Sequence, residues 1–214
     1  MKYIGGFNRK SINRDVKFAF ANENSIKTTS SDSSLGNLIK NNTHRHNLLL
    51  YIMTWICASF TFYLTYFLLK YLKGDVYLNC VVAALSEMAG YLISGKYYNR
   101  LGIKRSYLLY FSMGFIGSLL YLSLSHLHEN LVPILLLFTV YGISASCMTN
   151  WLSNARLFPV IYASSTHGIA SFFARLTNIM VSQVAELDHP IPLYFISGFC
   201  LIGLIVSQFM ITHP

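Results

Sequence analysis

One arginine lies in the middle of an apolar stretch, "ASFFARLTNIM" at residues 170–180. In an α-helix, residues three and four positions apart share a face. Those steps place Arg175 on a stripe formed by Ser164, Gly168, Ser171, Arg175, Asn178 and Ser182. Because such a stripe avoids lipid, we expect it to face other helices or a water-filled cavity. A guanidinium there could bind a carboxylate through two parallel N–H donors.

An acid lies on a similar stripe in an earlier apolar stretch. That stripe runs through Asn79, Ala83, Glu87, Gly90 and Ser94. A third stretch carries an aromatic cluster, Trp55, Phe62 and Tyr63. A quaternary ammonium is attracted by an anion and by aromatic faces. The pattern predicts a substrate site that holds an anionic group at Arg175 and a cationic group at Glu87.

A structural interpretation of the two charges stays open. Arg175 and Glu87 could pair with each other or with backbone carbonyls and so stabilise a helix bundle. The sequence shows no residues typical of catalysis: we find no Ser/His/Asp set, no Gly-rich phosphate loop and no paired carboxylates. The four cysteines are widely spaced, so we expect buried small hydrophobes rather than a zinc site or disulfides. We expect neither an enzyme nor a cofactor or metal, and the "HLH" at 126–128 indicates an exposed loop.

The elements that position these residues are six apolar stretches. Of the 214 residues, 54% are hydrophobic and 11% are charged, against about 25% charged in a soluble domain. The stretches fall at about 47–71, 76–96, 106–126, 131–153, 160–185 and 191–211, each near the roughly 20 residues of a membrane-spanning helix. Short polar links predict an antiparallel arrangement. The fold class is therefore expected to be an all-α membrane protein, a bundle of six transmembrane helices over residues 47–211.

The basic residues predict an orientation. Residues 1–46 are polar and Ser/Asn-rich, with eight Lys or Arg and three acids. They predict a flexible cytoplasmic segment, with a short amphipathic helix near 13–21 and no nucleic-acid motif. Links on the same side of the membrane as this segment carry more basic residues than links on the opposite side, where Lys70 and Lys73 lie. We expect both termini in the cytoplasm, contact with membrane lipid, and no glycan at Asn41.

Three segments resemble a known family. They are "KGDVYLNCVVAALSEMAGYLISGKYYNRLGIKRS" at 73–106, "NARLFPVIYASSTHGIASFFARL" at 154–176 and "DHPIPLYFISG" at 188–198. Together they resemble the C-terminal six-span half of organic ion transporters in the major facilitator superfamily. "GDVYLNC" and the "ARL" after small residues resemble the organic cation/carnitine branch. The resemblance extends over roughly residues 47–211.

The resemblance implies a plasma-membrane carrier that works by alternating access between two six-span halves. It implies that Arg175, Glu87 and the cluster from Trp55 to Tyr63 line the central cavity. Ser171 and Asn178 share the stripe of Arg175, so we expect them at the same site. The expected function is transport of small organic cations or carnitine-like zwitterions, with a second half or a second copy as partner. The alternative is a non-transporting subunit, or a truncated fragment, that modulates a full-length transporter.

The resemblance also implies a gating loop, with departures from the family pattern. The loop reads "NRLGIKR" and contains Arg100, Gly102 and Arg105. Asn99 stands where the family has an acid, and Ile103 where it has a base. Arg156 and Ala163, in "NARLFPVIYA", likewise replace an acid and a base. In the family such positions make cytoplasmic charge contacts that stabilise one state of the gate.

Overall fold

The computed structural model describes residues 40–71, 75–124 and 132–211. The chain divides into two units, Met1–Asn41 and Asn42–Pro214, and the description below concerns the second. The amphipathic helix expected near 13–21 and the "HLH" loop lie outside the described residues, as does most of the predicted 1–46 segment.

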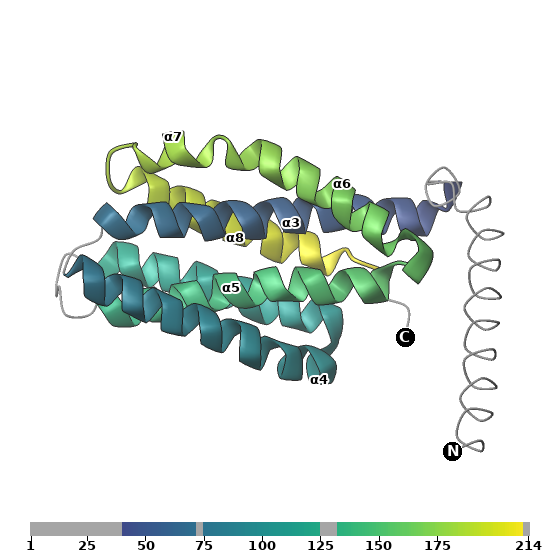
Figure 1. Cartoon of the computed structure of the whole chain (residues 1–214), viewed down its shortest axis with the longest axis horizontal. Helices are drawn as coiled ribbons and strands as arrows, with labels where there is room; N and C mark the ends of the chain where they lie inside the picture. The colour runs from purple at the N-terminus through teal and green to yellow at the C-terminus, as the bar shows by residue number, and fades with distance from the viewer. Residues whose placement is uncertain (1–39, 72–74, 125–131, 212–214) are drawn as a thin grey trace, which may run out of the picture. The chain divides into compact units, whose positions relative to one another are not determined.

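The described part of the second unit is built from helices (Figure 1). They are α3 (Asn42–Leu68) with the 3₁₀ turn η1 (Leu69–Tyr71), α4 (Val76–Leu124), α5 (Val132–Leu157), α6 (Val160–Asn178), α7 (Val181–Ala185) and α8 (Ile191–Gln208). Three helical segments of the described residues are long and apolar enough to cross a membrane, namely Asn42–Tyr71, Val76–Leu124 and Ile191–Gln208. The prediction of an all-helical protein with membrane-type helices is confirmed, and six crossings stay a prediction.

α4 consists of two antiparallel arms that meet at Gly102. The backbone of Gly102 has φ 78° and ψ 179°, a conformation that residues with a Cβ rarely adopt. The Tyr110 hydroxyl on the second arm donates to the Ser94 carbonyl on the first, across 3.3 Å. The stretches predicted at 76–96 and 106–126 fall on these two arms (Figure 1). The link expected between them is thus one sharp reversal with helix on both sides.

Glycines let the second arm of α4 approach α5 and α8 closely. A Cβ on Gly142 of α5 would lie 2.5 Å from the Gly114 backbone nitrogen. A Cβ on Gly203 of α8 would lie 2.7 Å from the Phe111 ring. In a membrane the hydrophobic effect does not drive helices together. Small residues at the crossings let the helices approach and gain van der Waals contact instead. These contacts fix how the helices that carry the site are placed.

Buried hydrogen bonds join α3, α4 and α5 beside this packing. The Asn150 side-chain oxygen accepts from the Thr54 hydroxyl at 3.1 Å and from the Tyr107 hydroxyl at 2.8 Å. Tyr107 also shares a hydrogen bond with Ser153 at 2.7 Å. Because all four side chains are buried, losing one partner would leave the others unsatisfied. The network therefore holds α3 at a defined rotation about its axis.

Three details differ from the sequence-based expectations. α3 begins at Asn42, five residues before the predicted boundary at residue 47. The helix predicted over 160–185 is interrupted at Ile179 and Met180, where the Met180 N–H donates to the Thr177 carbonyl at 3.1 Å in a tightened turn. All four cysteines are free, but Cys80 is exposed rather than buried.

Candidate functional site

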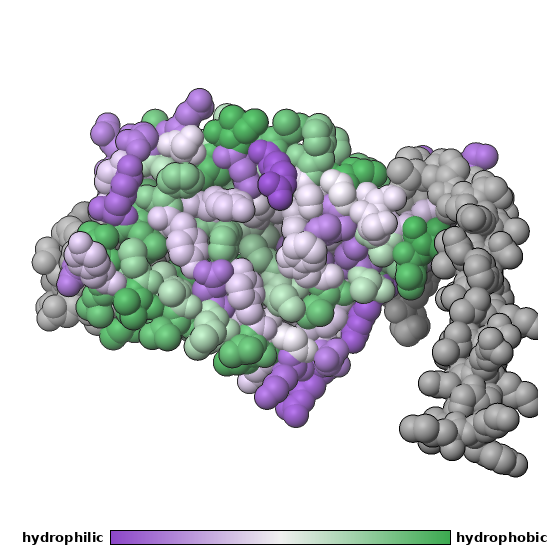
Figure 2. Space-filling model, viewed as in Figure 1, coloured by the Kyte–Doolittle hydropathy of each residue, from purple (hydrophilic) through white to green (hydrophobic). Residues whose placement is uncertain are grey.

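A cavity of about 240 Å³ lies among α3, α4, α5 and α6. Its wall combines aromatic rings, hydroxyls and one guanidinium. The lining residues are Trp55, Ala58, Ser59, Phe62, Tyr63, Tyr91, Cys147, Trp151, His167, Ser171, Ala174, Arg175 and Asn178. Figure 2 shows a more polar region in the middle of this face, with hydrophobic surface beyond it. The cavity thus offers polar groups within an otherwise apolar surface.

Most of the predicted substrate-binding residues meet at this cavity. Six of the seven line it, namely Trp55, Phe62, Tyr63, Ser171, Arg175 and Asn178. Helical spacing placed the last three on one face of α6, and that face is turned toward α3. The other stripe members, Ser164, Gly168 and Ser182, are not among the lining residues. That the six bind a substrate stays a prediction.

Arg175 lies at this cavity without a partner among the described residues. It is exposed and lies in the last turn of α6, where the negative end of the helix dipole favours a cation. Beside it, the Asn178 amide donates to the Ser59 hydroxyl at 2.6 Å and ties α6 to α3. No described residue forms a hydrogen bond or ion pair with the Arg175 guanidinium. The guanidinium is therefore available to an anionic group.

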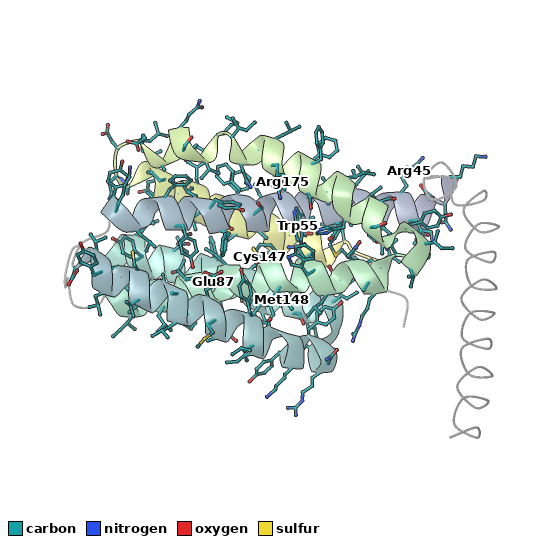
Figure 3. All side chains as sticks on the ribbon, viewed as in Figure 1. Arg45, Trp55, Glu87, Cys147, Met148 and Arg175 are labelled. Atoms are coloured by element: carbon teal, nitrogen blue, oxygen red, sulfur yellow. The ribbon has the colours of Figure 1, made fainter. Side chains whose placement is uncertain are left out.

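Glu87 lies behind the cavity wall rather than on it. Its carboxylate accepts a hydrogen bond from the Tyr66 hydroxyl. It also interacts with Tyr91 and Cys147, which do line the cavity. Figure 3 shows Glu87 on α4 and Arg175 on α6, with Trp55 and Cys147 between them in this view. The Arg175–Glu87 pair of the structural interpretation is not found among the described residues.

His167 is a cavity residue that the sequence interpretation missed. Its ring centroid lies 4.2 Å from that of Trp151 and 4.8 Å from that of Trp55. Its Nδ1 is 3.1 Å from the Tyr51 hydroxyl, and its Nε2 is 3.3 Å from the Ser171 hydroxyl. A step of four residues back from Ser171 could have found it. The stripe through Gly168, three residues back, does not include it.

The predicted gating residues meet around the α4 reversal. Arg156 donates to the Asn99 side-chain oxygen at 2.6 Å, and its guanidinium lies 4.7 Å from the centroid of the Tyr98 ring. Gly102 forms the reversal itself, and Arg100 and Arg105 flank it as exposed residues. The end of α5 is thus joined to α4 through an amide and a ring. A gating role for these residues stays a prediction.

Another polar contact joins η1, which follows α3, to the link between α7 and α8. The Lys70 ammonium lies 2.9 Å from one carboxylate oxygen of Glu186, and the Tyr71 hydroxyl donates to the other at 2.8 Å. The hydrogen bond from Lys70, assisted by that from Tyr71, lowers the pKa of Glu186. Because the groups are exposed, water screens the contact and its effect on stability is small.

Comparison with known proteins gives a similarity over most of the chain. No family model matches the chain. The chain is 26% identical over 174 residues to a Drosophila melanogaster protein described as "Organic cation transporter-like protein". The aligned part covers 76% of this chain and 29% of that protein, so the chain spans less than a third of the length of this relative. The similarity suggests a transporter family, and membership of the major facilitator superfamily stays a prediction.

Proposed function

We propose that this chain forms part of a multi-pass membrane transporter for small organic ions, with carboxylate-bearing zwitterions as its preferred class. The observation that carries the proposal is the Arg175 guanidinium, which lines the cavity without a partner among the described residues. A carboxylate can accept two parallel hydrogen bonds from it. Hydrogen bonds to charged groups contribute about 1.5–3 kcal/mol each, or roughly a tenfold to hundredfold change in affinity.

The aromatic residues supply a place for the cationic end. Trp55, Phe62, Tyr63 and Trp151 line the same cavity, and their faces attract a quaternary ammonium by about 0.5–2 kcal/mol. Glu87 adds a negative charge beside Tyr91, which lines the cavity, and this charge favours a cation there. A carnitine-like zwitterion or an organic cation with a polar tail matches this distribution.

The proposal includes an assembly. Arg175, Tyr63 and Trp151 are exposed in the single chain although they line the cavity. A second six-span half, or a second copy, would cover them and complete an alternating-access carrier. The cavity volume of about 240 Å³ is small for a ligand site, in keeping with a wall that a partner completes. We further propose a plasma-membrane location, cytoplasmic termini and no enzymatic activity.

Uptake into proteoliposomes tests this function. The full chain would be reconstituted alone and with a co-expressed six-span partner, and uptake of carnitine and of tetraethylammonium would be measured. Arg175→Gln should lower carnitine uptake tenfold or more, and tetraethylammonium uptake less than about threefold. Glu87→Gln should lower both.

Arg45→Gln is the matched control, because Arg45 is exposed and its side chain bonds to the nearby Asn42, away from the cavity lining. It should leave both uptakes unchanged. Equal loss of the two substrates in Arg175→Gln, with expression intact, would contradict the proposed role of the guanidinium. Uptake of neither substrate by well-folded protein, alone or with its partner, would favour the non-transporting subunit.

A further inference from the structure

We propose that His167 is a reversible proton-binding residue of the cavity, and that its protonated form favours the anionic end of a ligand. The nature of the ligand rests on the proposed function, whereas proton binding rests on the surroundings of the imidazole ring. His167 would then determine specificity together with Arg175, by giving the cavity a second positive charge when the pH falls. An imidazole is the side chain best suited to change charge near neutral pH.

Two tryptophans hold the imidazole ring. The Trp151 ring lies at 4.2 Å and 38° to it, and the Trp55 ring at 4.8 Å and 84°. An imidazolium in contact with indole rings is stabilised by their electron-rich faces. The rings therefore compensate part of the cost of placing a charge in a largely apolar wall.

The hydrogen-bond partners suit both charge states of the ring. Nδ1 faces the Tyr51 hydroxyl at 3.1 Å and Nε2 faces the Ser171 hydroxyl at 3.3 Å. A hydroxyl can donate or accept. The neutral ring can thus donate from one nitrogen and accept at the other, and the protonated ring can donate from both. Each ring nitrogen therefore keeps a hydroxyl partner in both charge states.

Titratable groups lie near the ring on α3, α4, α5 and α6. Tyr51 faces it from α3, and Arg175 lies two turns along α6, about 12 Å away along the axis. The other titratable residues of the described cavity lining are Tyr63 of α3, Tyr91 of α4 and Cys147 of α5. None of these carries a negative charge at neutral pH, and Glu87 lies behind the wall. A protonated ring would therefore have no anion in the cavity until a ligand brings one.

A bound carboxylate would supply that anion. It would interact favourably with Arg175 and with a protonated His167, so proton and carboxylate should increase each other's affinity by the same factor. A quaternary ammonium in the same cavity should have the opposite effect. The cavity should consequently prefer carboxylates more strongly in acid than in alkali.

Tryptophan fluorescence can follow this proton directly. The chain contains two tryptophans, and both contact the His167 ring. Because an imidazolium quenches the emission of an adjacent indole, emission should fall in one transition between about pH 8 and pH 5. His167→Gln should abolish the transition. His46→Gln is the matched control, since His46 does not line the cavity and its ring bonds to the Phe209 carbonyl instead.

The result that overturns proton binding is a flat emission profile in the unmodified protein, or a transition that survives in His167→Gln. Should His167→Gln fail to fold, Ser171→Ala provides the second test. It removes one hydroxyl partner and should move the midpoint by at least about 0.3 pH, a twofold change in proton affinity. An unmoved midpoint would count against the proposal.

Two probes of similar size test the coupling. 3-Phenylpropionate should raise the midpoint by about 0.5–1 pH, equivalent to a threefold to tenfold coupling, and phenyltrimethylammonium should lower it. Calorimetry should show matching changes in phenylpropionate affinity. Equal affinity at pH 5 and pH 8, with binding intact, would overturn the coupling alone. Binding of neither probe at any pH, with the fluorescence transition intact, would overturn the coupling and the proposed function together.

Discussion

Arg156 on α5 and Asn99 on α4 are joined by a hydrogen bond of 2.6 Å beside the Gly102 reversal. The same guanidinium lies over the Tyr98 ring, at 4.7 Å from its centroid. In this contact only Arg156 is charged, because its partners are a neutral amide and a ring. Both Arg156 and Asn99 are exposed, so the contact can be changed without disturbing the core.

Asn99→Asp should convert this contact into an ion pair. An exposed pair contributes about 0.2–1 kcal/mol, which should raise Tm by roughly 1–3 °C at low salt. The gain should disappear in molar salt, because screening is then nearly complete. Thermal unfolding in detergent at both salt concentrations measures it. The same gain in an Arg156→Gln background would show that the new carboxylate acts elsewhere.

Close packing of α4 on α5 predicts a large effect at Gly142. Gly142→Ala places a Cβ 2.5 Å from the Gly114 backbone nitrogen, where no flexible side chain can yield. Overpacking of this kind costs about 1–3 kcal/mol, and Tm should fall by several degrees. Gly198→Ala on α8 is the control, because its Cβ meets nothing within 4 Å. It should be neutral or stabilising, since Ala is the better helix former. Equal effects at the two sites would contradict the packing.

The Lys70–Glu186 contact predicts a pH effect of defined sign. The hydrogen bond from Lys70 lowers the pKa of Glu186 in the folded protein. The contribution of this contact to stability is therefore present above the pKa that Glu186 has in the unfolded chain. It is lost as the pH falls through the lower pKa of Glu186 in the folded protein. The difference in Tm between the unmodified protein and Glu186→Gln should be positive at pH 7 and shrink toward about pH 3. A difference that is constant over this range would contradict the prediction.

The sequence predicted the helices better than their rotations. Apolar length alone located both arms of α4, and helical spacing placed Ser171, Arg175 and Asn178 on one face of α6. The same reasoning expected Glu87 to line the cavity. Packing decided otherwise, because Ser86 donates to the Leu137 carbonyl of α5 and so turns the first α4 arm.

The aromatic end of the cavity shows what spacing alone could not reveal. His167 is defined by partners that lie far from it in the sequence, including Tyr51 at 116 positions and Trp151 on a different helix. Periodicity describes one helix at a time, whereas a cavity wall is shared among several. The rotation of each helix depends on buried contacts such as Thr54 with Asn150, which join residues 96 positions apart.

The separation of Arg175 from Glu87 gives the last prediction. Glu87 accepts its hydrogen bond from Tyr66, and no ion pair joins it to Arg175 among the described residues. Residues without a shared partner have additive effects within about 0.5 kcal/mol. The double substitution Arg175→Gln with Glu87→Gln should therefore change Tm by the sum of the single changes. Tyr66→Phe with Glu87→Gln should instead be non-additive, because these two residues are bonded. Restoration of stability in the Arg175–Glu87 double variant, measured by thermal unfolding, would show that the two charges pair and that Arg175 is not free to bind a ligand.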